Sequence, residues 1–187
     1  AEQLWVGNNP WASGSAMWAD GTDVLSKTPQ DFQEKLYAMN ELQQYNFFYS
    51  SAVKFITSDP MVFIKNTSKK FFYFWWFSPQ AGKLYPSRWT DIYKAYYVFF
   101  FIFFSMGSWF SFRRSAGINK PIFLSLFLLF FLVSILHSVY YIEIRHRWSI
   151  EPFMCIISAF GFISLIRKFK NKYHLNIIKE ETHEDSR

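Results

Sequence analysis

Cysteine is almost absent from this 187-residue chain, in which Cys155 is the only one. A single thiol forms no internal disulfide and builds no cysteine cluster for a structural metal. The four histidines, at positions 137, 146, 174 and 183, are scattered and show no metal-ligand spacing. We therefore expect no metal site, and we interpret Cys155 as a small apolar residue within a hydrophobic run.

The chain also lacks the residue patterns of common soluble enzymes. It has no Ser-His-Asp set, no glycine-rich phosphate loop and no obvious pair of carboxylates. Asp20 and Asp23 lie among turn-forming residues and are interpreted as loop acids. If the protein is an enzyme, its catalytic acid or base is expected upstream of Ala1, on further membrane spans and loops that this fragment lacks.

Charge is missing from long stretches in the second half of the chain, where the apolar residues are concentrated. Hydrophobic residues make up 51% of the chain and 24 residues are phenylalanine, which excludes an ordinary soluble domain. Apolar runs of ~20 residues are long enough to cross a bilayer as helices. The sequence predicts three such spans, at about 93–112, 121–142 and 150–166.

The third run is the shortest of the three. Its charge-free part, Pro152–Ile166, reaches about 22 Å at the helical rise, which is less than the thickness of a hydrocarbon core. Trp148 and the Lys/Arg side chains after Ile166 can extend this span by anchoring at the two interfaces. A re-entrant helix is the alternative.

The first 88 residues contain no run of spanning length and predict a region of amphipathic helices. Residues 1–27 are rich in Gly, Asn, Ser and Trp and form a loop, which either packs against the protein or the bilayer interface or lines a substrate cleft. Helical spacing of apolar residues predicts two amphipathic helices between residues 28 and 58, with a break near Asn40. An interfacial helix that ends in an aromatic belt is expected at 61–77.

Positive charge sets the orientation. Three Lys/Arg residues lie in the 113–120 loop and four open the C-terminal tail, against two in the hairpin at 143–151. By the positive-inside rule, loop and tail are cytoplasmic, whereas the hairpin and residues 1–88 are extracytoplasmic. The predicted domains are therefore an outer region at 1–88, a transmembrane region at 89–172 and a cytoplasmic tail at 173–187. Nucleic acid is not an expected partner, because the basic clusters flank spans and do not line a folded face.

Two arginines in the hairpin, Arg145 and Arg147, are the leading candidates for a binding site. Arginine is a preferred phosphate ligand because its planar fork donates two hydrogen bonds and keeps its charge. The positive-inside rule does not explain arginines on the outer side, and we expect them to bind a lipid phosphate. A role in head-group contacts or in ion pairs with Glu143 and Glu151 is the alternative.

Other ionisable residues form a second group of candidates. His137 lies within the second predicted span, where an ionisable side chain is either functional or hydrogen-bonded to a neighbouring span. His146 lies between the two arginines. Lys54, Lys65, Lys69 and Lys70 are predicted to form a basic side that meets anionic head groups or a lipid-linked substrate, and Lys69 is carried forward as a possible site residue.

Three segments resemble bacterial membrane glycosyltransferases of family 39, which are related to dolichyl-phosphate-mannose–protein mannosyltransferases. LWVGNNPWASG at Leu4–Gly14 resembles their N-L-Y-I-G-N-N-P-x-A-x-G segment, and IEIRHRWSIEPFMCIISAFG at Ile142–Gly161 is similar to their R-Y-R-x-P-x-E-P-x-L-x-x-L-A-A-x-G segment. Ala52–Phe74 fits a helix of the family that reads A-x-x-F-I-x-x-x-P and then carries a lysine before aromatic residues. The chain departs from the family at His146 and Ser149, which replace an aromatic residue and a proline.

The resemblance implies the C-terminal part of a GT-C fold: an all-α membrane protein with outer amphipathic helices and about three transmembrane helices. Such enzymes transfer a sugar from a polyprenyl-phosphate carrier to a glycan, lipid or protein acceptor outside the cytoplasm, here at a bacterial inner membrane. Their catalytic aspartate lies in a first outer loop that this chain lacks, and a lipid-linked sugar is the only cofactor-like ligand implied. Carrier phosphate is expected near Arg145 and Arg147, with Asn8, Asn9 and Trp11 in a loop over the cavity.

Two other classes of protein are alternatives. A non-enzymatic polytopic protein, such as a transporter or lipid-handling subunit, would have polar residues lining a path through the spans, and only His137 and a few serines are available. A membrane-anchored structural module needs only the spans and leaves Arg145 and Arg147 unexplained.

Overall fold

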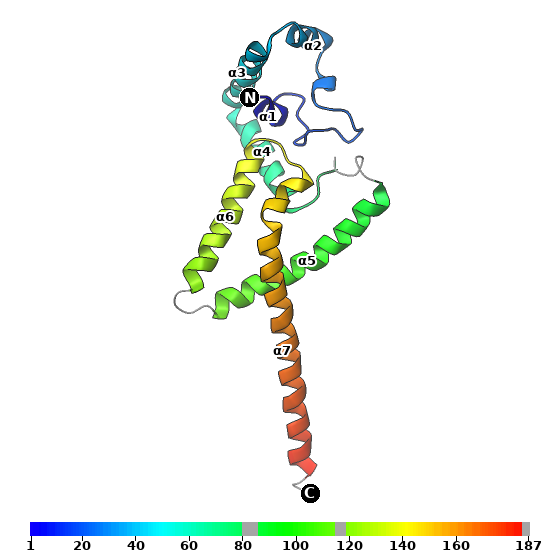
Figure 1. Ribbon diagram of the computed structural model, residues 1–187, viewed down its shortest axis with the longest axis vertical. Coiled ribbons are helices and arrows are strands. Elements are labelled where there is room, and N and C mark those ends of the chain that lie inside the picture. The colour runs from blue at the N-terminus through cyan, green and yellow to red at the C-terminus, as the bar shows by residue number, and fades with distance from the viewer. Residues whose placement is uncertain (80–85, 115–118, 185–187) are drawn as a thin grey trace. The chain divides into compact units, whose positions relative to one another are not determined.

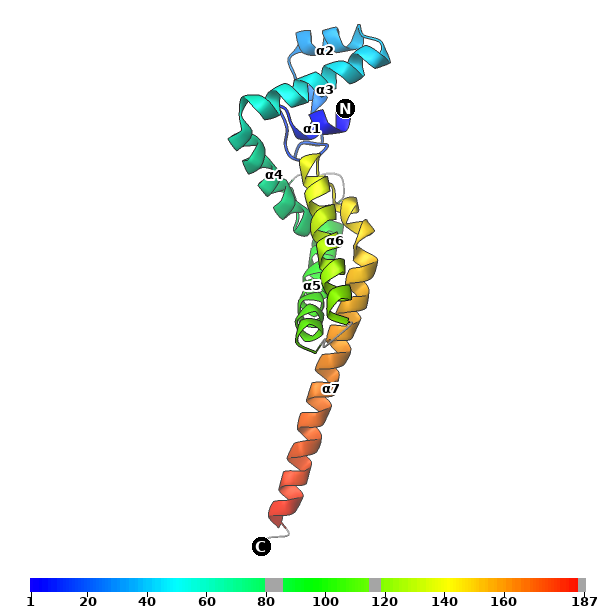
Figure 2. The same ribbon diagram turned by 90° about the vertical axis from the view of Figure 1, so that its left-hand side faces the viewer.

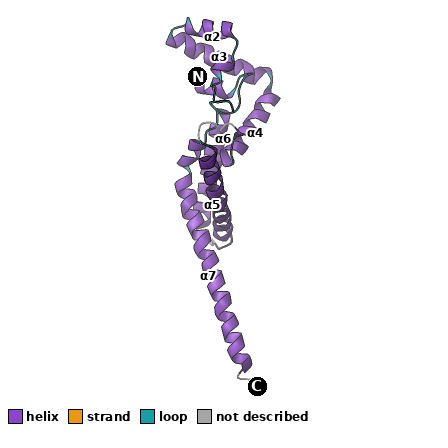
Figure 3. Cartoon of the chain, turned by 90° about the vertical axis from the view of Figure 1, so that its right-hand side faces the viewer, coloured by secondary structure: helices purple, strands orange, loops and turns teal. Residues whose placement is uncertain are grey.

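The computed structural model describes residues 1–79, 86–114 and 119–184, and within these ranges it consists of helices and loops without a strand (Figure 3). The prediction of an all-α chain is confirmed. In order, the elements are α1 (Glu2–Gly7), η1 (Leu25–Lys27), α2 (Gln30–Tyr37), α3 (Glu41–Ser58), α4 (Pro60–Trp75), α5 (Ser87–Arg114), α6 (Asn119–Val139), η3 (Ile144–Ser149) and α7 (Glu151–Glu184).

Three helices are long and apolar enough to cross a membrane, which confirms the predicted number of spans. Their spanning segments are Arg88–Arg113, Lys120–Val139 and Glu151–Lys170. The second helix ends at Val139, earlier than the predicted residue 142, because the backbone after Val139 bonds to other segments, as described below. The third segment is longer than predicted, since α7 continues without a break to Glu184, into the segment predicted as a tail.

The chain divides into two compact units. The first contains Ala1–Lys94 and Phe127–Ser149, and the second contains Ala95–Leu126 and Ile150–Arg187. The first unit therefore combines the N-terminal region with the end of α6 and the hairpin, and the division into outer, transmembrane and cytoplasmic regions stays a prediction.

The core of the first unit forms where α1 packs against α3, as Figures 1 and 2 show. Trp5 of α1 is almost fully buried, and its ring lies 5.6 Å from that of Phe32 and 5.0 Å from that of Phe48. The buried residues of this cluster are Trp5, Val24, Leu36, Phe48 and Ala52. The N-terminal helices therefore share one aromatic core, to which the loop before η1 contributes Val24.

Side-chain caps mark the boundaries of the amphipathic helices. Asn40 begins α3 with a capping box, in which its side chain accepts from the Gln43 N–H and the Gln43 side chain accepts from the Asn40 N–H. This confirms the predicted break near Asn40. Asp59 accepts a hydrogen bond from the Val62 N–H at 3.0 Å, and Pro60 opens α4, so that the chain turns sharply between α3 and α4 (Figure 2).

In the second unit, α5 and α7 touch backbone to backbone at two glycines. A Cβ atom on Gly161 would lie 2.6 Å from the Gly107 nitrogen and would clash with the Phe103 carbonyl oxygen. The Phe103 and Phe162 rings pack edge to face at 5.2 Å beside this contact. Small residues at such crossings let membrane helices approach closely, which is a main source of their association.

We predict that Gly161→Ala destabilises the protein in detergent by roughly 2 kcal/mol, because the new methyl group forces the two backbones apart. Unfolding by titration with sodium dodecyl sulfate, followed by circular dichroism, measures this change. At an uncrowded helix position the same substitution stabilises by up to about 1 kcal/mol, so a gain in stability would refute the crossing. Ala159→Leu, at an exposed position of α7, is the matched control and should change stability by less than about 0.5 kcal/mol.

Candidate functional site

A buried lysine, Lys70, lies at the centre of the first unit. Only 1% of its surface is exposed. Lys70 shares a face of α4 with Phe63 and Phe74, because residues three, four and seven apart lie above one another on a helix. Burial lowers the pKa of the Lys70 ammonium to about 7. A buried lysine needs partners that compensate for the loss of water.

The partners of Lys70 are oxygen atoms at the ends of two helices. Its Nζ lies 2.7 Å from the Tyr140 carbonyl oxygen, 3.1 Å from that of Gly7 and 3.4 Å from that of Val139, and 3.2 Å from Asn8 Oδ1. Gly7 ends α1 and Val139 ends α6, and helix C-termini carry unsatisfied carbonyls and partial negative charge. One ammonium group therefore caps both helices.

Asn8 and Asn9, which were predicted to lie in a loop over a cavity, are both buried. Asn8 Nδ2 donates to the carbonyls of Leu4 at 2.8 Å and Val139 at 2.7 Å, so that this amide joins the ends of α1 and α6. Asn9 Nδ2 donates to the Trp5 carbonyl at 2.6 Å. These contacts show that both side chains hold the loop in place, and their position over a substrate cavity stays a prediction.

Gly7 allows the closest approach in this site. A Cβ atom there would overlap the Tyr140 carbonyl oxygen. Beyond it, the Ile142 N–H donates to the Gly14 carbonyl at 3.0 Å. The loop after α1 therefore lies directly on the segment after α6, and this contact ends α6 at Val139.

Trp11 packs against the helical core, which is one of the two placements expected for the N-terminal loop. Its ring lies 5.8 Å from that of Phe32, and its carbonyl accepts a hydrogen bond from Trp18 Nε1 at 3.1 Å.

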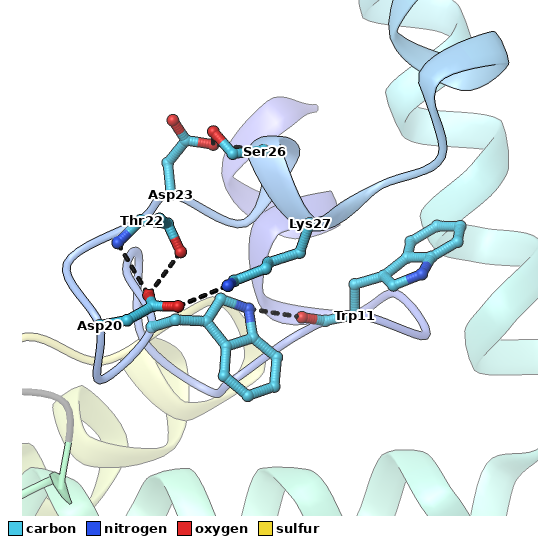
Figure 4. A network of polar contacts seen from close by, with 7 residues as sticks. Trp11, Asp20, Thr22, Asp23, Ser26 and Lys27 are labelled. Atoms are coloured by element: carbon cyan, nitrogen blue, oxygen red, sulfur yellow. Dashed lines mark hydrogen bonds and ion pairs between the residues drawn. The ribbon is translucent and has the colours of Figure 1, made fainter.

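The two loop acids are held by their neighbours (Figure 4). Asp20 accepts hydrogen bonds from Thr22 and pairs with Lys27, and these contacts hold the pKa of the Asp20 carboxyl well below its usual range, Lys27 most strongly. Asp23 accepts from the N–H and hydroxyl of Ser26. Both carboxylates thus stabilise turns.

The two hairpin arginines have different surroundings. The Arg145 side chain is 62% exposed, and its Nε lies 2.6 Å from Glu143 Oε2. Arg147 is buried, with its guanidinium carbon 5.1 Å from the Phe77 ring centroid and 6.0 Å from that of Tyr93, which is cation–π geometry. Residues two apart in the 3₁₀ turn η3 point in different directions. Arg145 is the member of the pair accessible to a ligand, and joint phosphate binding stays a prediction.

The two predicted histidines stack on each other. The ring centroids of His137 and His146 lie 4.5 Å apart, with 19° between the ring planes. The Phe74 ring also stacks with His137, at a centroid distance of 5.9 Å. His146 Nδ1 accepts a hydrogen bond from the Glu143 N–H at 3.2 Å. Burial, together with repulsion from His137 and Arg145, lowers the pKa of His146 to about 4. The stack therefore connects α4, α6 and η3 through packed rings.

Lys69 is exposed, as are Lys54 and Lys65, and its Nζ lies 5.6 Å from the Tyr73 ring centroid. Lys70 is buried, so the prediction that it belongs to the same basic side is wrong. The spacing of Phe63, Lys70 and Phe74 indicated the burial of Lys70, because it places this lysine on the apolar face of α4.

Within the ranges given above, no three His, Cys, Asp or Glu residues are grouped to hold a metal ion.

We predict that Lys70→Met lowers the free energy of unfolding by roughly 2–4 kcal/mol, because buried oxygens at two helix ends lose their donor. Detergent-phase unfolding, as for the glycine variant, measures the loss. Lys69→Met, on the exposed neighbour, should leave stability nearly unchanged. Equal behaviour of the two variants would contradict the capping role of Lys70.

We predict that stability falls as the pH drops from 7 towards 4. The unfolded chain binds a proton at His146 near pH 6.5, whereas the folded chain binds it only near pH 4, so the unfolded state gains the more protons between these values. His146→Phe keeps an aromatic ring and removes this titration. Melting temperatures measured across the range should therefore fall less steeply for the variant, and parallel profiles would argue against the buried neutral histidine.

No known protein family, curated protein or solved structure matches this chain.

Proposed function

We propose that this chain is the C-terminal part of an integral membrane glycosyltransferase, which moves a sugar from a polyprenyl-phosphate carrier to an acceptor outside the cytoplasm. Three helices that can cross a membrane support a membrane protein. One observation carries the rest of the proposal: the segments that resemble the family 39 enzymes contact one another around Lys70.

These contacts join residues that define the resembling segments. Gly7 and Asn8 of the GNNPWASG stretch bind the ammonium of Lys70, which is one of the two lysines, Lys69 and Lys70, before the aromatic residues of α4. Gly14, at the end of that stretch, accepts the hydrogen bond from Ile142, at the start of the third segment. Their convergence is the arrangement that one functional site built from these segments would need, and it supports the proposal of a GT-C enzyme.

The proposed reaction is an inverting sugar transfer. An acceptor hydroxyl attacks the anomeric carbon of the lipid-linked sugar, the bond from that carbon to the phosphate oxygen breaks, and the carrier leaves as a lipid phosphate. The hydroxyl proton passes to a carboxylate that we place upstream of Ala1. Cationic groups stabilise the charge that develops on the leaving phosphate. Arg145 is exposed and can do so, while the aromatic contacts of Arg147 fix the turn that presents it.

The transporter alternative gains no support from the polar residues of α6. Ser134 and Ser138 are buried, but their hydroxyls donate to the carbonyls of Phe130 and Ser134 in the same helix, each at 2.6 Å. Hydroxyls that bond back to their own helix do not line a polar path.

We predict that Arg145→Glu lowers sugar transfer by roughly 10–100-fold, because charge reversal repels the carrier phosphate. The assay uses membrane vesicles that contain the full-length protein, of which this chain is the proposed C-terminal part, and follows a radiolabelled sugar from decaprenyl phosphate donors into endogenous acceptors. Arg167→Glu, at an exposed position near the other end of the α7 span, is the matched control and should retain activity.

Two results would count against these proposals separately. Full transfer by Arg145→Glu would exclude that arginine from carrier binding. Absence of transfer by the wild-type protein from every lipid-linked sugar tested would reject the glycosyltransferase.

A further inference from the structure

We propose that a small pocket in the first unit is a binding site for a phosphate group. The pocket lies between the loop after α1 and one face of α4, with an empty volume of about 230 Å³. Its lining residues are Gly7, Ala12, Ser13, Gly14, Asn66 and Lys69.

The loop side of the pocket is held rigidly. Gly7 is fixed against the Tyr140 carbonyl and the Lys70 ammonium, and Gly14 is fixed by its hydrogen bond from Ile142. A Cβ atom on Gly14 would lie only 3.3 Å from Lys70 Cγ, so the buried lysine stem supports this wall from behind. A pocket with fixed walls loses little conformational entropy when a ligand binds.

The α4 side supplies two donors, of which Lys69 also lies over the Tyr73 ring, 5.6 Å from its centroid. Asn66 and Lys69 are three residues apart and therefore project from the same side of the helix. None of the six lining residues is acidic, and Lys69 forms no ion pair within the described part of the chain. The Asn66 side chain is half-buried and makes no hydrogen bond to any residue that the structure describes.

These donors suit a phosphate oxygen. A lysine ammonium is a compact charge with three N–H groups and is a common phosphate ligand, while an amide adds neutral donors that fix orientation. The pocket is small and open to solvent, so it fits a small charged group better than a complete sugar.

The phosphate can belong to a lipid or be free in solution, since both present the same oxygens. If it belongs to the polyprenyl carrier, the pocket adds Lys69 and Asn66 to the carrier site, and this assignment rests on the proposed function. The site itself does not depend on that assignment, because phosphate binding requires no sugar transfer.

The test measures binding to the full chain, purified in dodecyl maltoside without added phospholipid. Isothermal titration calorimetry is carried out separately with decaprenyl phosphate and with inorganic phosphate. We expect Lys69→Ala to weaken binding about 10-fold or more and Asn66→Ala to weaken it by a smaller factor. Lys65→Ala, which removes an exposed lysine one turn away on α4 and outside the pocket, should leave binding within about 2-fold of the wild type.

Each outcome has one meaning. Lys69-dependent binding of inorganic phosphate supports a site for the free anion, and Lys69-dependent binding of the lipid alone supports a lipid phosphate. Equal losses in the Lys65 and Lys69 variants would overturn the proposal in favour of general surface charge, and so would unchanged binding in Lys69→Ala. Failure of the wild-type protein, with an unchanged circular dichroism spectrum, to bind either compound would also overturn it. Binding without sugar transfer would reject only the glycosyltransferase, while transfer without Lys69-dependent binding would reject only the pocket.

Discussion

The buried ammonium of Lys70 is the interaction on which the first unit depends. Moving a lysine out of water is costly unless its charge and all of its N–H groups find partners. The ends of α1 and α6 supply these partners, because a helix C-terminus concentrates carbonyl groups that lack donors. The hydrogen bonds between the ammonium and these carbonyls therefore compensate for the desolvation of both groups, provided that both helix ends and α4 are held together.

This requirement explains why small and amide residues gather in the stretch after α1. Any side chain at Gly7 would separate α1 from Tyr140, and the ammonium would then lose one of its acceptors. Asn8 accepts from Lys70 with its oxygen and donates to Leu4 and Val139 with its nitrogen. A carboxylate cannot donate these bonds, and a hydroxyl has only one hydrogen for the two carbonyls. The stretch is thus specified by contacts with residues 62 to 131 positions away in sequence.

Length and hydrophobicity were sufficient to predict the three spanning helices, and the helical spacing of apolar residues was sufficient to predict the break near Asn40. The burial of Lys70 was not predicted. Its spacing from Phe63 and Phe74 indicates the apolar face of α4, but most of its partners are backbone carbonyls, which look the same at every position of a sequence. The end of α6 at Val139 was missed for the same reason. Arg145 and Arg147 were treated as a pair because they are close in sequence, whereas the 3₁₀ turn directs one to the surface and the other onto aromatic rings.

The long sequence separation of the Lys70 contacts also has a consequence for biosynthesis. About 70 residues separate Lys70 from Tyr140, so at typical translation rates the lysine leaves the peptidyl-transferase centre roughly 4–14 s before its closest acceptor has been made. During that interval the ammonium has the acceptors of Gly7 and Asn8 but lacks those at the end of α6. The N-terminal helices can therefore complete their polar contacts only after the segment that ends α6 has been translated.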